Sequence, residues 1–207
     1  MSEKLEQILK LVGEYISDKR SAETWAEGDW VKYSGPYYDA EEYKSAVETL
    51  LGEWLIFGEK AREFEREFPQ FLGKKHGIFT NSGSSANLIM TSVLRSVTKL
   101  PKKYRVAPGA KFITPIVCFP TTINPLLQNG YEPVFVDVDI PSLNLNLDQV
   151  EKLLIEDTNK EIRGIIFAHV LGNPPDMDRL MSLVDKYDIK NYVFILMNYQ
   201  NNKLDSH

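Results

Sequence analysis

The feature that most constrains the fold of this chain is an alternation of short apolar runs and helical stripes that begins at residue 77. The predicted strands are Gly77–Thr80, Lys111–Thr114, Pro133–Asp137, Gly164–Ala168 and Tyr192–Ile195. The helical spacing of apolar residues between them predicts helices over 84–98, 121–129, 147–156 and 176–187. Short apolar strands separated by helices indicate a parallel sheet that is covered on both faces. The sequence therefore predicts an α/β fold with three layers, α/β/α, around a mostly parallel sheet.

The first 75 residues follow a different, helical pattern. An amphipathic stripe predicts a helix over residues 3–18, and Asp39 followed by Glu42 resembles a capping box. A second stripe starts there, includes Trp54 and stops near Gly58.

A third helix is predicted over residues 61–71, with a break at Pro69. The break is expected because a proline inside a helix removes one hydrogen bond and costs about 3 kcal/mol.

Three polar segments follow predicted strands and should meet at one edge of the sheet. They are Ser82–Ser85, Val117–Thr122 and His169–Asn173. In open parallel sheets, ligands bind outside the carboxyl ends of the strands. The sequence therefore predicts a ligand site at this edge.

The stretch Thr80–Leu88 contains the most suggestive of these segments. Its small residues lead from a predicted strand into a helix, whose first N–H groups have no partner within the helix. We expect Gly83 to allow a tight turn, and Ser84 and Ser85 to add hydroxyls, which suits a phosphate or a carboxylate. An ordinary helix N-cap explains the same residues, because Ser and Asn are preferred there. The other segments at the sheet edge favour the anion site.

The bulk properties of the chain exclude several classes of protein. The 207 residues carry a net charge of −5, which predicts no general affinity for nucleic acid or for anionic membranes. Cys118 is the only cysteine, so no internal disulfide is possible and a reducing compartment is expected. The amino terminus is too polar for a signal peptide, and no apolar run approaches the ~18 residues of a membrane span. We expect a cytoplasmic protein without a metal site.

Four motifs in order resemble one enzyme family. They are Asn81-Ser-Gly-Ser-Ser-Ala-Asn-Leu88, Phe119-Pro-Thr-Thr122, Pro133-Val-Phe-Val-Asp-Val138 and His169-Val-Leu-Gly-Asn-Pro174, with Tyr33-Ser-Gly-Pro36 upstream. Together they resemble the DegT family of sugar-nucleotide aminotransferases, and most of all its CDP-4-keto-6-deoxyglucose 3-dehydrase branch. The resemblance runs from about Trp30 to Ile195. It implies the amino-terminal part of the large domain of a fold-type I (aspartate aminotransferase-like) enzyme that uses pyridoxal 5'-phosphate.

The resemblance also implies roles for individual residues. Gly83, Ser84 and Ser85 correspond to the positions that hold the cofactor phosphate, and Phe119 corresponds to the aromatic residue that stacks on the pyridine ring. Thr121, with its neighbour Thr122, would shape the same wall, although both threonines could simply cap a helix.

Two further residues are expected near the cofactor or the substrate. The resemblance places His169 and Asn173 there, at the end of the next strand. A purely structural role for His169 remains an equal alternative at this point.

The chain departs from the family pattern after Ile195. The family's acid at the pyridine nitrogen should follow this strand, but the sequence has Asn198 and a polar tail that includes Lys203. The resemblance therefore implies residues 1–75 as a helical segment packed on the large domain, 76–195 as an incomplete cofactor-binding large domain, and 196–207 as a divergent tail, with the small carboxyl-terminal domain absent.

No catalytic residue is assigned for this reason, and the chain is expected to be inactive alone. The intact family member would be a homodimer acting on a keto-deoxy sugar nucleotide by amination or dehydration. The alternative is a non-catalytic remnant that binds phosphate or the cofactor weakly, or dimerises with an intact homologue. A nucleotide-binding α/β module is disfavoured, because the sequence has neither G-x-G-x-x-G nor G-x-x-x-x-G-K-[ST].

Overall fold

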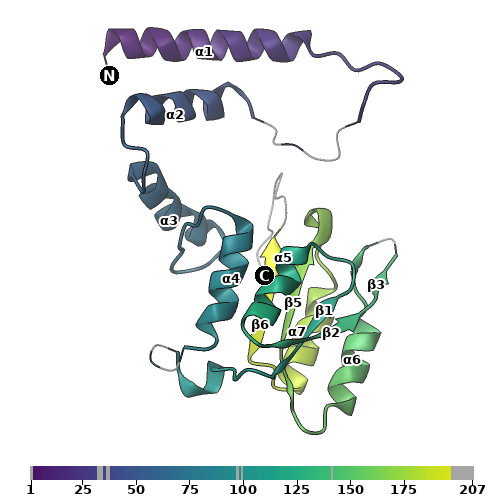
Figure 1. Ribbon diagram of the computed structural model, residues 1–207. Coiled ribbons are helices and arrows are strands. Elements are labelled where there is room, and N and C mark those ends of the chain that lie inside the picture. Colours follow the sequence, from purple (N-terminus) through teal and green to yellow (C-terminus); the bar gives the residue numbers. More distant parts are fainter. Residues whose placement is uncertain are drawn as a thin grey trace. The chain divides into compact units, whose positions relative to one another are not determined.

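A computed structural model describes residues 2–31, 35, 38–96, 98, 100–140 and 142–196, the last six of them by backbone alone. The chain divides into two compact units, residues 1–79 and 80–207, which are described separately (Figure 1). Most of the segment Tyr33–Pro36 and the tail from residue 197, with Asn198 and Lys203, lie outside the described residues.

The described residues of the first unit contain three helices: α1 (Glu3–Ala22), α2 (Ala40–Leu51) and α3 (Glu59–Phe71). The capping box at the start of α2 is confirmed, with the Glu42 carboxylate accepting from the Asp39 amide at 2.7 Å. The helix ends at Leu51, so the prediction that it includes Trp54 was wrong. The Gly52 amide already bonds to carbonyls of the last turn, and Glu53 has a positive φ of 61°, which takes the chain out of the helix.

Helix α3 continues past Pro69 to Phe71, so the predicted break at this proline was wrong. Pro69 lies in the last turn, where the only bond lost is the one its missing N–H would donate to Glu65. Its own carbonyl accepts from Lys74 N at 2.7 Å and closes the helix end. The buried Pro69 ring packs against Gly77, where a side chain would collide with it.

The second unit is built on a parallel sheet with the strand order β2-β1-β5-β6. The strands are β1 (Lys111–Pro115), β2 (Glu132–Val136), β5 (Ile162–His169) and β6 (Asn191–Leu196). Each overlaps its predicted run, and their parallel pairing confirms the predicted sheet. A short antiparallel pair, β3 (Val138–Asp139) with β4 (Asn144–Leu145), was not predicted.

The helices of this unit are α4 (Gly83–Val93), α5 (Pro120–Gln128), α6 (Leu147–Glu156) and α7 (Met177–Lys186), with short 3₁₀ turns at Lys102–Tyr104 and Val170–Gly172. The predicted helices are confirmed, except that the first ends at Val93 and not at residue 98. The helix ends there because the Leu94, Arg95 and Ser96 amides donate to carbonyls three residues back, and not four as in an α-helix.

Buried apolar side chains cover both faces of the sheet, which confirms the three-layer α/β/α fold. On one face, Ile113 and Ile165 of the sheet pack with Val150 of α6 and Leu180 of α7. On the other face a smaller cluster joins the sheet to α5: Val106, Phe112, Leu126, Tyr131 and Ile166.

The first predicted strand, Gly77–Thr80, was wrong. These residues form no ladder with another described strand. The Phe79 amide donates instead to the side chain of Glu65 on α3, at 2.7 Å. A β-prone run becomes a strand only when a neighbouring strand takes up its backbone hydrogen bonds.

Candidate functional site

The amino terminus of α4 combines a helix cap with two spare amide groups. Ser82 is the N-cap: its Oγ accepts from Ser85 N at 3.1 Å, and its carbonyl accepts from Ala86 N at 3.0 Å. The Ser82 hydroxyl also lies 3.1 Å from Ser85 Oγ. The amides of Gly83 and Ser84 have no acceptor among the described residues. The cap and the anion site are therefore compatible, since they use different N–H groups.

Gly83 contributes space and not an unusual backbone conformation. Its φ is not among the positive values of the described glycines, so this turn does not depend on a left-handed backbone conformation. A Cβ added to Gly83 would meet no atom within 4 Å. The space beside the Gly83 Cα is therefore open, in the turn that carries the two amides.

The amino terminus of α5 lies beside α4, and a buried side chain joins the two helices. Phe119 precedes the helix with 58% of its surface exposed. One turn into α4, Asn87 is only 4% exposed, and its Nδ2 donates to the Thr121 carbonyl at 3.1 Å. The structure thus brings the Ser84 amide end and the Phe119–Thr121 segment together. Asn87 was not among the predicted site residues.

His169 ends β5, the strand next to β1 in the sheet. It is half-buried, and its ring lies 5.7 Å from that of Phe167. Desolvation lowers the pKa of His169 below its ordinary value of about 6.5, so the neutral imidazole is favoured near pH 7. The neutral ring carries one hydrogen-bond donor and one acceptor at the carboxyl edge of the sheet.

This lowered pKa predicts a pH-dependent loss of stability. As the pH falls through about 6.5 the unfolded chain takes up a proton first, so the free energy of unfolding should decrease and level off below the folded pKa. His169→Gln should remove part of this decrease. Urea unfolding at pH 7.5, 6.5 and 5.5 measures it, with the exposed His76→Gln as the control. Identical slopes in H169Q and the wild type would contradict the prediction.

Asn173 lies in a separate hollow of the same unit. Its Nδ2 donates to the Ser142 carbonyl at 3.3 Å, and it lines a cavity of about 290 Å³ with Asn144 and Arg179. No described contact joins this cavity to the residues at the start of α4. Asn173 and Ser84 were predicted to share one site, and the structure shows no direct link between them.

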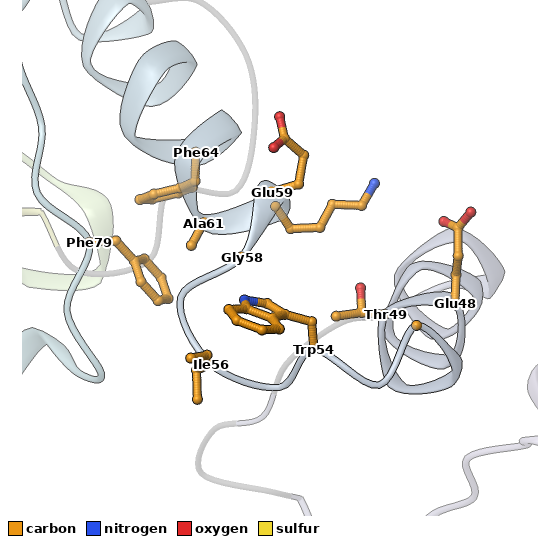
Figure 2. A pocket seen from close by; sticks show the side chains of 11 residues that line it. Glu48, Thr49, Trp54, Ile56, Gly58, Glu59, Ala61, Phe64 and Phe79 are labelled. Atoms are coloured by element: carbon orange, nitrogen blue, oxygen red, sulfur yellow. The ribbon is translucent and has the colours of Figure 1, made fainter.

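A larger, apolar hollow of about 620 Å³ belongs to the first unit (Figure 2). Trp54 lies beside the Gly58 loop with its Nε1 donating to the Phe57 carbonyl at 3.3 Å. Phe64 and Phe79 form another wall, with their rings edge to face at 5.5 Å. None of the residues predicted to hold a cofactor lines this hollow.

The parallel sheet, with the start of α5 after β1 and with α4 joined to that start through Asn87, defines an α/β domain suited to a phosphate-bearing ligand. Residues 36–192 match the DegT/DnrJ/EryC1/StrS aminotransferase family, and the chain belongs to this family. The predicted resemblance is thereby confirmed.

Individual relatives agree with this assignment. The chain is 38% identical over 185 residues to the lipopolysaccharide biosynthesis protein RfbH of Salmonella typhimurium, covering 89% of this chain and 41% of that protein. It is 37% identical to the dTDP-4-dehydro-2,6-dideoxy-D-glucose 3-dehydratase of Saccharopolyspora spinosa, covering 89% and 38%. The structure resembles E. coli GDP-4-keto-6-deoxy-D-mannose-3-dehydratase with bound hydrated PLP, with a TM-score of 0.66, 30% identity and coverage of 80% and 40%.

The chain thus spans about two fifths of the length of these relatives. A search of the helices in the described part of the chain finds none with the length and apolar character to cross a membrane.

Proposed function

We propose that the second unit forms part of a pyridoxal 5'-phosphate site. The start of α4 would bind the cofactor phosphate, and Phe119 would stack on the cofactor ring. The observation that carries this is the pair of spare amides at Gly83 and Ser84, next to open space and joined through Asn87 to the segment that bears Phe119. The related E. coli dehydratase is described with bound hydrated PLP, which supports the same assignment.

The residues fit the cofactor at both of its ends. A phosphate group is favoured at the start of α4 by the two amides and by the positive end of the helix dipole. The exposed Phe119 offers a flat apolar face against which an aromatic ring can stack. The amide and hydroxyl of the half-buried Ser85 are already engaged by Ser82, so the amides of Gly83 and Ser84 are the ones proposed to hold the phosphate. When bound, the cofactor supplies an electron sink, and the protein orients it.

The substrate we propose is a keto-deoxy sugar nucleotide, which the intact family member would aminate or dehydrate. Two relatives are named as 3-dehydratases of 4-keto sugar nucleotides, which supports this class of substrate. His169 and Asn173 are proposed to face the substrate from the edge after β5.

We also propose that the protein is cytoplasmic and works as a homodimer. A reducing compartment agrees with a single cysteine, Cys118, whose burial raises its thiol pKa and keeps it protonated. The apolar hollow beside Gly58 supports the dimer, since apolar surface of this kind is suited to a second copy.

The 207-residue chain alone is proposed to bind the cofactor without turning over substrate. The resemblance requires an acid after Ile195, and Asn198 cannot supply a negative charge there. The alternative, a remnant that pairs with an intact homologue, is tested by native mass measurement of the two proteins mixed.

The proposal is tested by titrating the full chain with pyridoxal phosphate. We expect saturable binding, seen in the absorbance and fluorescence of the cofactor, that inorganic phosphate displaces. Borohydride reduction of the complex should leave no stable bond between the cofactor and a lysine on which turnover depends. A transaminase assay should show no activity. Absence of saturable binding would contradict the proposed cofactor site, and turnover by this chain would contradict the proposed inactivity.

A further inference from the structure

A proline leaves one carbonyl in the first turn of α5 without its helical partner. In an α-helix the carbonyl of residue i accepts from the amide of residue i+4. Four residues after Thr121 the chain has Pro125, which has no N–H. The Thr121 carbonyl therefore lacks the donor that any other residue at position 125 would offer.

Asn87 of α4 supplies a donor at this position. Its side-chain Nδ2 lies 3.1 Å from the Thr121 carbonyl, and the residue is 4% exposed. A buried polar group left without a partner costs about 1–3 kcal/mol, so this bond matters more than one at the surface.

Further buried contacts continue this link along the two helices. Thr91 is 1% exposed, and its hydroxyl donates to the Asn87 carbonyl at 2.9 Å. Asn129, after α5, donates from Nδ2 to Thr91 Oγ1 at 3.3 Å and to the Pro125 carbonyl at 2.8 Å. The polar groups thus form a continuous seam between the two helices, Asn87–Thr91–Asn129, and Asn129 Nδ2 also donates to Ser92 Oγ at 3.2 Å.

We infer that Asn87 is a positioning residue that holds the α5 segment bearing Phe119 and Thr121 against the amide end of α4. The inference that the Asn87–Thr121 hydrogen bond holds the two helices together, which we call the pin, rests on the contacts above. The consequence of this bond for ligand binding rests on the proposed function. A phosphate contacts only α4, whereas the whole cofactor also stacks on Phe119, so Phe119 must keep a fixed position relative to α4.

The pin is tested by a double-mutant cycle between Asn87→Ala and Pro125→Ala in the full chain. Pro125→Ala restores an N–H that can donate to the Thr121 carbonyl, so it should make Asn87 dispensable. We expect N87A to lower the folding equilibrium constant on the order of 10-fold with Pro125 present. With alanine at position 125 the loss should fall below about 3-fold. Urea unfolding of the four proteins measures both values.

The matched control is Asn144→Ala. Asn144 is also a buried asparagine, 4% exposed, in the same unit, and no described contact joins it to α5. Its effect should be the same with proline or alanine at position 125. Equal losses for N87A in the two backgrounds would overturn the pin.

The positioning role is tested by comparing two ligands, pyridoxal phosphate and inorganic phosphate. N87A should weaken binding of pyridoxal phosphate about 10-fold and leave inorganic phosphate within about 2-fold. A general structural defect would weaken both ligands alike and would overturn the positioning role. If the wild type binds neither ligand while the cycle shows coupling, the proposed function and the role toward the cofactor fail and the pin stands.

Discussion

Ser84→Asp is expected to weaken binding of pyridoxal phosphate on the order of 100-fold without loss of fold stability. The added carboxylate lies at the second residue of α4, next to the Gly83 and Ser84 amides, where it repels a phosphate. Two like charges about 4 Å apart repel by about 1 kcal/mol in water and about 4 kcal/mol near a protein surface. Fluorescence titration at low salt measures the loss.

The same substitution should stabilise the helix slightly, which separates a binding defect from a folding defect. An acidic side chain in the first helical turn favours the dipole by about 0.3–1 kcal/mol. The neutral Ser84→Asn, with a similar side-chain size to aspartate, is the matched control and should bind far better than S84D. Equal affinity in S84D and S84N would show that the phosphate does not lie at the start of α4.

Phe112→Ala is expected to have the largest effect on stability, lowering the free energy of unfolding by about 3–5 kcal/mol. Phe112 lies on β1, is 1% exposed, and packs with Tyr131 at a ring distance of 4.9 Å. Its removal leaves a cavity beneath α5, between Leu126 and Ile166. Such a loss is a large part of the 5–15 kcal/mol that stabilises a typical domain.

Phe135→Ala is the control for this prediction. Phe135 lies on the neighbouring strand β2 but is 45% exposed, so its truncation should cost less than about 1 kcal/mol. Urea denaturation followed by circular dichroism compares the two variants. Similar midpoints for F112A and F135A would show that the cluster beneath α5 does not carry the stability of the sheet.

Much of the second unit follows from local patterns. Helix α6 begins and ends at the residues that the apolar spacing predicted, 147 and 156, because its N-cap Asn146 and its apolar stripe depend only on residues adjacent in sequence. The strands at the centre of the sheet were predicted for the same reason: a buried parallel strand is a continuous apolar run.

The site was predicted only in part. The motif around Ser84 and the Phe119 segment pointed to a phosphate-bearing ligand, and the structure joins the two through Asn87. The signal for Asn87 was present in the sequence as a proline four residues after Thr121, but the identity of the donor depends on which helix packs alongside.

The sequence by itself determined the periodicities, the caps and the order of the family motifs, since each of these depends on neighbours along the chain. Only the tertiary structure decided which carbonyls and amides find partners. Gly77–Thr80 is no strand because the Phe79 amide bonds to Glu65, and Pro69 stays within its helix because it lies in the last turn and packs against Gly77. Hydrogen-bond partners far apart in sequence meet only when the elements pack, and local propensity cannot specify them.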